Sequence, residues 1–186
     1  GFLKLFPNPK TLIFSKEKMN SQKISKVTSS FDEHFNNLLY QMFEVNQKEG
    51  IPLMIEKSDD ITNYEGYKLK IEKEVITIIA KQPNGAFYGL LTLRDILNSD
   101  NQLCLEIEDY PDLAVRGVML DISRSKVPTL DTLKKLVVIF ATLRYNHLEL
   151  YIEGFSFEYQ SFKHLLSDNN YLCLQDYLEL EKFAQE

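Results

Sequence analysis

The pattern of hydrophobic and polar positions along the chain changes near residue 112. Before that point, apolar and polar residues alternate in the segments 67–71 and 75–80, which are separated by a short charged turn. Because successive side chains of a strand point to opposite faces, this alternation predicts a β-hairpin in an antiparallel or mixed sheet. Further strands are predicted for residues 11–14, 52–57 and 103–107.

Two segments have apolar residues at helical spacing and predict helices that cover this sheet. The first helix is predicted to begin at a capping box, S-F-D-E at 30–33, and to end near Gly50. The second is predicted to begin at Asn84-Gly85 and to end at the polar residues 98–101. Together with the extended connector that Pro111 favours, these elements predict a small two-layer α+β domain over residues 1–112. The apolar positions are Phe31, Phe35, Leu38, Leu39, Met42 and Phe43 in the first helix, and Phe87, Leu90, Leu91 and Leu97 in the second.

Residues 113–186 follow a different pattern. The run Val118-Met119-Leu120 is continuously apolar, which is typical of a parallel strand that is covered on both faces. A helix is predicted from Pro128-Thr129 to Asn146, before a strand at 147–153, and a further helix over 174–184. This β-α-β-α order is typical of an α/β fold and predicts the first part of a (β/α)8 TIM barrel. The apolar stripe of the first of these helices is Leu133, Leu136, Val137, Phe140 and Leu143.

Both predicted strands of this second part lead into candidate ligand-binding residues. The polar face of strand 147–153 ends in Glu153, at the carboxyl end where βα-barrels have their active sites. An edge strand with its polar side in water explains the same alternation. Arg124 follows the first strand, and its guanidinium could donate to two neighbouring hydroxyls, although a surface ion pair is the commoner role of such an arginine.

Composition and charge exclude several classes of function. Hydrophobic residues make up 44% and charged residues 26% of the 186 residues, a balance typical of a globular protein. The net charge of −6 arises from interleaved acidic and basic residues, so we expect no nucleic-acid partner. No apolar run approaches the roughly 20 residues that cross a bilayer, and the first residues lack a signal-peptide core. We therefore expect a soluble protein without a membrane partner, in a compartment that the sequence does not reveal.

Cysteine and histidine residues give no sign of a metal site. Cys104 and Cys173 are far apart in the sequence and lack metal-ligand neighbours, which favours buried free thiols over a disulfide. His34, His147 and His164 do not have the spacing of a zinc site. We predict no metal.

Several segments together resemble glycoside hydrolase family 20, the β-N-acetylhexosaminidases. The sequence R-G-V-M-L-D-I-S-R at 116–124 resembles the first barrel strand of that family. The sequence Y-N-H-L-E-L at 145–150 resembles the second. Other similar segments are D-Y-P at 109–111 and V-P-T at 127–129 beside the first strand, and E-G-Y-K-L at 65–69 and G-A-F-Y-G-L-L-T-L at 85–93 in the domain that precedes the barrel.

This resemblance implies an activity and a set of site residues. The activity is removal of a terminal β-linked N-acetylglucosamine or N-acetylgalactosamine with retention, without a cofactor and with the substrate's acetamido oxygen as nucleophile. Arg124 matches the family arginine that binds the outer hydroxyls of the sugar, and Asp121 is expected to support that guanidinium. Glu153 is a third candidate, although well-studied members have an Asp-rich segment followed by Trp at its position. The family's catalytic Asp-Glu pair lies on a later strand, so we expect no catalytic residue in this segment and no turnover by it.

Three interpretations remain open from the sequence. The chain could be part of a longer hexosaminidase, and the unfinished barrel would then expose apolar surface and favour self-association. It could be a naturally short protein whose leading domain binds carbohydrate or a partner without hydrolysis. It could also be another sugar hydrolase with a similar leading domain, an O-GlcNAcase or hyaluronidase-like relative, although the D-I-S-R ending at 121–124 argues against this.

Overall fold

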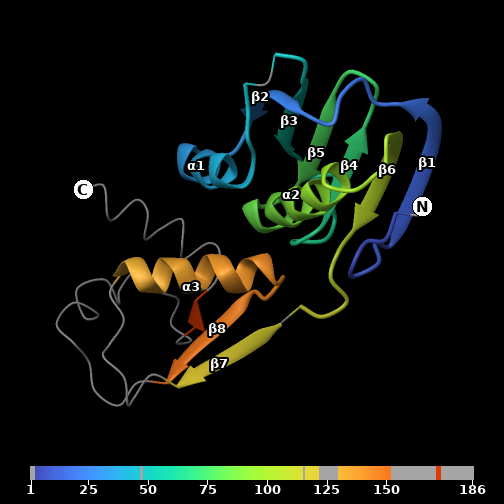
Figure 1. Ribbon diagram of the computed structural model, residues 1–186. Coiled ribbons are helices and arrows are strands. Elements are labelled where there is room, and N and C mark those ends of the chain that lie inside the picture. Colours follow the sequence, from blue (N-terminus) through green and yellow to red (C-terminus); the bar gives the residue numbers. More distant parts are fainter. Residues whose placement is uncertain (1–2, 47, 115, 122–129, 152–170, 173–186) are drawn as a thin grey trace. The chain divides into compact units, whose positions relative to one another are not determined.

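The computed structural model divides into two compact units, Gly1–Asp112 and Leu113–Glu186 (Figure 1). Each unit has its own β-sheet. The residues that the structure describes are 3–46, 48–114, 116–121, 130–151 and 171–172.

The first unit is built on a six-stranded mixed sheet. Its strands are β1 Thr11–Lys18, β2 Ile24–Ser29, β3 Ile51–Lys57, β4 Tyr67–Ile71, β5 Ile76–Ala80 and β6 Leu103–Asp109, in the order β1-β6-β4-β5-β3-β2. The predicted hairpin forms the centre, since β4 and β5 pair antiparallel from Tyr67 opposite Ala80 to Ile71 opposite Ile76. Strands β6 and β1 extend the antiparallel side, whereas β3 and β2 add in parallel beyond β5.

Two helices, α1 at Glu33–Met42 and α2 at Pro83–Leu97, complete the first unit (Figure 1). Helix α2 packs on β4 and β5 and also contacts α1. All of residues 84–93 are buried, so α2 lies deeper than its predicted one-sided stripe implied. One face of the sheet forms the core, because alternate residues of the central strands are buried, among them Leu53, Ile55, Leu69, Ile71, Ile76 and Ile78.

The predicted start and end of the first helix were wrong. The N-cap is Asp32 rather than Ser30, because the Asp32 carboxylate accepts a hydrogen bond from the Phe35 N–H at 3.1 Å. The helix ends at Met42, and Phe43 is extended with φ −130° and ψ 137°. Phe31 lies outside the helix, where its ring is 5.2 Å from the ring of Phe35.

Both edge strands of this sheet differ from the prediction. Strand β2 was not predicted, because Ile24 is the one fully buried residue in its polar sequence I-S-K-V-T-S. Strand β1 continues past the predicted 11–14 through the exposed residues 15–18. Charged residues are common on edge strands, where they discourage pairing with another chain, and they weaken the hydrophobic pattern from which a strand is predicted.

The second unit contains β7 at Gly117–Asp121, α3 at Leu130–Thr142 and β8 at His147–Tyr151 (Figure 1). Strands β7 and β8 are parallel and in register from Gly117 opposite His147 to Asp121 opposite Tyr151, which confirms the predicted β-α-β unit. A two-residue strand, β9 at Tyr171–Leu172, pairs antiparallel with β8 and was not predicted. The predicted helix over 174–184 lies outside the described residues.

The predicted apolar stripe of α3 was wrong at Leu143. Val137 and Ala141 are buried, whereas Leu143 is 60% exposed. The helix ends at Thr142, so Leu143 no longer lies on the helical face that the 3.6-residue period predicts. Ile139, on another side of the helix, is 53% exposed.

Candidate functional site

Of the predicted sugar-binding residues, Asp121 ends β7, while Arg124 and Glu153 follow β7 and β8 in the sequence. Asp121, the last residue of β7, lies opposite Tyr151, the last residue of β8. Arg124 comes three positions after Asp121, and Glu153 comes two positions after Tyr151. Arg124 and Glu153 lie outside the described residues, and of Asp121 the structure describes the backbone. The two strand ends are therefore side by side, at the edge where the sequence predicts the site.

The amino ends of the same two strands are joined by Arg116 and Asn146. The Arg116 backbone N–H donates to Asn146 Oδ1 at 2.8 Å, and the Asn146 backbone N–H donates to Arg116 O at 3.0 Å. Asn146 Nδ2 also donates to Ala114 O at 2.6 Å. The Arg116 side chain donates from Nε to Arg144 O at 2.9 Å and from Nη1 to Leu113 O at 2.6 Å. Arg116 and Asn146 belong to the two segments that resemble barrel strands, and their role in the structure is to hold these strands together.

A turn at the end of α3 directs the chain into β8. Arg144 has a left-handed backbone with φ 64°, and its N–H donates to Ala141 O at 2.8 Å. The Tyr145 N–H donates to Phe140 O at 2.9 Å, which completes a Schellman motif. The rings of Phe140 and Tyr145 lie 6.2 Å apart in an edge-to-face arrangement. The turn therefore determines where β8 begins.

In the first unit, the two segments that resemble the family's leading domain pack against each other. The hydroxyls of Tyr67 and Thr92 share a hydrogen bond of 2.6 Å, and Thr92 also donates to Tyr88 O at 3.2 Å. The Tyr88 hydroxyl donates to Glu65 Oε1 at 3.4 Å, and Glu65 is only 7% exposed. Buried polar groups are normally paired in this way, so the cluster acts in packing rather than in catalysis.

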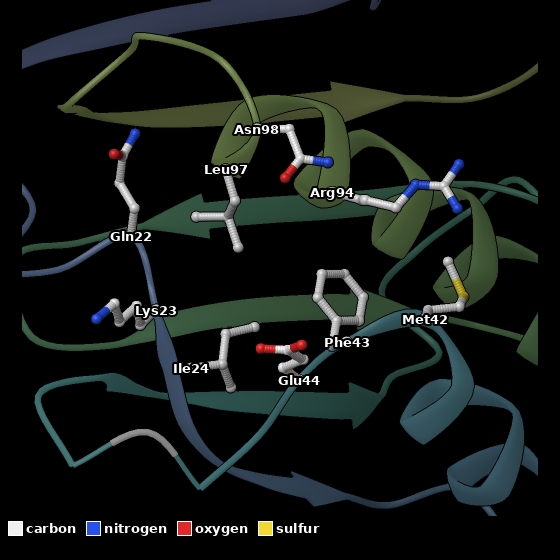
Figure 2. A pocket seen from close by; sticks show the side chains of 9 residues that line it. All are labelled: Gln22, Lys23, Ile24, Met42, Phe43, Glu44, Arg94, Leu97 and Asn98. Carbon is white, nitrogen blue, oxygen red and sulfur yellow. The ribbon is translucent and has the colours of Figure 1, made fainter.

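A pocket of about 330 Å³ lies beside the C-terminal end of α2 (Figure 2). It exists because α1 ends at Met42 and the extended backbone of Phe43 takes the chain past β2. The Asn46 N–H donates to Ser25 O at 2.8 Å and holds this segment against the sheet. The lining residues are Gln22, Lys23 and Ile24 around the start of β2, Met42, Phe43 and Glu44 at the end of α1, and Arg94, Leu97 and Asn98 at the end of α2.

No sequence pattern points to this pocket. Its side chains come from three segments that are far apart in the sequence, and no motif connects them. The polar segment 98–101 is the one part of the sequence that hints at it, and its pattern indicates only the end of a helix.

Cys104 is a free thiol and is buried, as predicted, whereas Cys173 lies outside the described residues. Burial raises the pKa of the Cys104 thiol, and the carboxylates of Glu17 and Glu72 raise it further. A thiol that stays protonated is a poor nucleophile, so Cys104 is a core residue.

The described residues contain no group of three or more His, Cys, Asp and Glu side chains that could hold a metal ion. In that same part of the chain, no helix combines the length and the apolar character needed to cross a membrane.

The comparison with known protein families agrees with the motifs of the first unit. Residues 3–110 match the family model described as glycosyl hydrolase family 20, domain 2, which is more than half of the chain. The chain belongs to glycosyl hydrolase family 20. This confirms the resemblance that the sequence segments indicated, and it assigns the six-stranded sheet with α1 and α2 to domain 2 of the family.

Two curated proteins illustrate how this family 20 chain compares with its relatives. The β-hexosaminidase of Porphyromonas gingivalis is 34% identical in an alignment of 99 residues that covers 47% of this chain and 13% of the relative. The β-N-acetylhexosaminidase of Cellulomonas fimi is 31% identical in an alignment of 93 residues that covers 47% of this chain and 18% of the relative. The chain thus spans less than a fifth of the length of either relative.

The similarity to solved structures covers a larger share of this family 20 chain than the similarity to these two curated proteins does. The β-N-acetylhexosaminidase from Bacteroides fragilis has a TM-score of 0.61 at 22% identity, over 78% of this chain and 32% of that chain. The family 20 exo-β-N-acetylglucosaminidase from Vibrio harveyi, solved in complex with N-acetylglucosamine, has a TM-score of 0.59 at 21% identity, over 79% of this chain and 25% of that chain. At these identities the likeness shows a shared mixed α/β fold.

Proposed function

We propose that this chain provides domain 2 and the first strands of the catalytic barrel of a β-N-acetylhexosaminidase. The complete enzyme would remove terminal β-linked N-acetylhexosamine with retention, using the substrate's acetamido oxygen as nucleophile. The supporting observation is the order of the two units. The family 20 match ends at residue 110, and the parallel β7-α3-β8 unit begins at Gly117.

The parallel pairing of β7 and β8 supports a sugar site at their carboxyl ends. Neighbouring strands are about 4.8 Å apart, so side chains that follow both strands can reach one sugar ring. In this proposal Arg124 binds two outer hydroxyls through its planar, forked guanidinium. Asp121 holds that guanidinium in place by charge-assisted hydrogen bonds, and Glu153 contacts the sugar from the neighbouring strand.

The proposal assigns the general acid to a part of the barrel beyond β7 and β8. A general acid must lie within hydrogen-bond reach of the glycosidic oxygen, in a pocket that excludes water. In the family this role belongs to an Asp-Glu pair on a later strand. The segment with β7 and β8 would therefore bind the sugar and would not hydrolyse it.

A chromogenic assay tests this proposal. The complete gene product and the chain of 186 residues are compared on 4-nitrophenyl N-acetyl-β-glucosaminide and N-acetyl-β-galactosaminide, with the α-linked anomers as matched controls. We expect the complete product to hydrolyse at least one β-linked substrate and neither α-linked one, and the chain alone to hydrolyse none. A complete product that is inactive on both β-linked substrates would contradict the proposal and favour a non-hydrolytic binding role.

A further inference from the structure

We propose that the pocket beside the C-terminal end of α2 is a binding site for a neutral sugar residue of a glycan. All nine lining residues belong to the first unit. The class of ligand, a neutral sugar, is inferred from these side chains. The further expectation that this sugar is part of a substrate glycan rests on the proposed function.

Gln22 offers the pocket a fixed hydrogen-bond acceptor. Its Nε2 donates to Ser99 O at 3.2 Å and to Asn101 O at 2.7 Å. An amide nitrogen has two hydrogens, so these bonds use both donors and leave Oε1 as an acceptor. Within the described part of the chain, no group donates to Oε1.

The end of α2 adds donors on one side of the pocket, and Glu44 adds acceptors on the other (Figure 2). Arg94 is half-buried in the last turn of α2, and none of the described residues accepts a hydrogen bond from its guanidinium. Asn98 caps the helix through its backbone N–H, which bonds to Arg94 O and Ile96 O. Its carboxamide makes no hydrogen bond to the described residues. The lining of the pocket thus contains both donors and acceptors.

Apolar side chains and Lys23 form the remaining surface of the pocket. Phe43 and Leu97 are half-buried, and Ile24 is 2% exposed. A sugar satisfies both kinds of surface, because its hydroxyls donate and accept hydrogen bonds while its C–H faces pack against an aromatic ring. A purely apolar ligand would leave the guanidinium of Arg94 without a hydrogen-bond acceptor. An anion would pair with Arg94 and Lys23, but it only accepts hydrogen bonds and could not donate one to the carboxylate of Glu44.

The size of the pocket limits the ligand to a small one. Its volume of about 330 Å³ lies near the lower limit of the ~300–1,000 Å³ that is usual for small-molecule sites. We propose that the pocket holds a single sugar residue, one side of which stays open to solvent. We expect a dissociation constant on the order of 1 mM.

Nuclear magnetic resonance of the 15N-labelled chain tests this inference, with N-acetylglucosamine as the probe. We expect saturable shift changes in the backbone amides of residues 22–24, 43–44 and 94–98. Arg94→Ala and Asn98→Ala should each weaken binding by about tenfold, because each removes a hydrogen bond to the sugar. Asp95→Ala is the matched control, since Asp95 lies on the same helix, is exposed and does not line the pocket.

Three results would overturn the inference. They are no saturable shift at these residues, wild-type affinity in the folded Arg94→Ala and Asn98→Ala proteins, or shifts confined to residues 117–153. The last result would locate the sugar at the carboxyl ends of β7 and β8, and it would support the proposed function. Conversely, an inactive complete gene product would contradict the proposed function while leaving the sugar titration of this pocket valid.

Discussion

Gly85 lies so close to Gly66 that a Cβ atom at Gly85 would be 2.2 Å from the Gly66 carbonyl oxygen. Real Cβ atoms essentially never come within 3.0 Å of another heavy atom in this way. The first turn of α2 and the residue before β4 therefore touch through their backbones. This contact explains the glycine at residue 85, in the segment G-A-F-Y-G that resembles domain 2 of the family.

Gly85→Ala should destabilise the first unit. The added methyl group would meet backbone rather than a flexible side chain, so we expect a loss of about 2–3 kcal/mol in the free energy of unfolding. Gly66→Ala is the matched comparison, because the atoms nearest to its Cβ, which are Asn63 Cβ, Asn63 O and Ile61 Cγ2, would lie 3.2 Å away rather than 2.2 Å. Urea unfolding followed by circular dichroism measures both. Equal losses in the two variants would show that the close approach is not what requires glycine at residue 85.

The hydroxyls of Tyr67 and Thr92 should be energetically coupled. Tyr67→Phe removes the 2.6 Å hydrogen bond between buried groups, and we expect a loss of about 1–2 kcal/mol in unfolding free energy. In a double-mutant cycle with Thr92→Val, the double variant should lose less than the sum of the single variants. Strict additivity in urea unfolding would mean that this hydrogen bond does not contribute to stability.

Asn146→Ala should loosen the second unit and leave the first unaffected. The substitution removes the acceptor for the Arg116 N–H and the donor to Ala114 O, at a cost of about 1–2 kcal/mol. Asn146→Asp is the matched control, since it keeps the acceptor and removes only the donor, and we expect an intermediate effect. Amide hydrogen exchange measures the change in β7 and β8. Unchanged exchange in both strands would contradict the role assigned to Asn146.

Burial of Cys104 should make stability depend on pH at the alkaline end. Because the folded pKa of this thiol is raised, its contribution to stability is complete below the unfolded pKa and is lost as pH rises towards the folded pKa. We therefore expect the unfolding free energy to fall above about pH 8.5. The fall should be smaller in the Cys104→Ala variant. Both proteins contain Cys173, so the two pH profiles differ only through the Cys104 thiol. Identical pH profiles for the two proteins would refute this assignment.

The sequence predicted the elements whose side chains alternate or repeat clearly. The hairpin of β4 and β5 was predicted from the alternation at Tyr67–Ile71, since one face of each strand is buried. The end of α1 could not be predicted, because Phe43 continues the helical spacing of apolar residues while its backbone is extended. Strand β2 was missed because parallel pairing with β3, rather than its own polar sequence, makes it a strand.

The candidate sites differ in how far the sequence could reveal them. Arg124 was found through a contiguous motif, which a sequence displays directly. The pocket lined by Gln22, Phe43 and Arg94 depends on where α1 ends and on how three distant segments pack, and the spacing of residues along the chain does not show either.

The most direct test of the account measures the effect of Arg124→Lys on the complete gene product. Lysine keeps the charge and loses the bidentate fork, so KM for 4-nitrophenyl N-acetyl-β-glucosaminide should rise about tenfold or more while the melting temperature stays unchanged. Lys135→Arg, an exposed position on α3, is the matched control and should leave both quantities unchanged. An Arg124→Lys protein with the wild-type KM would contradict the claim that this chain supplies the sugar-binding arginine of a β-N-acetylhexosaminidase.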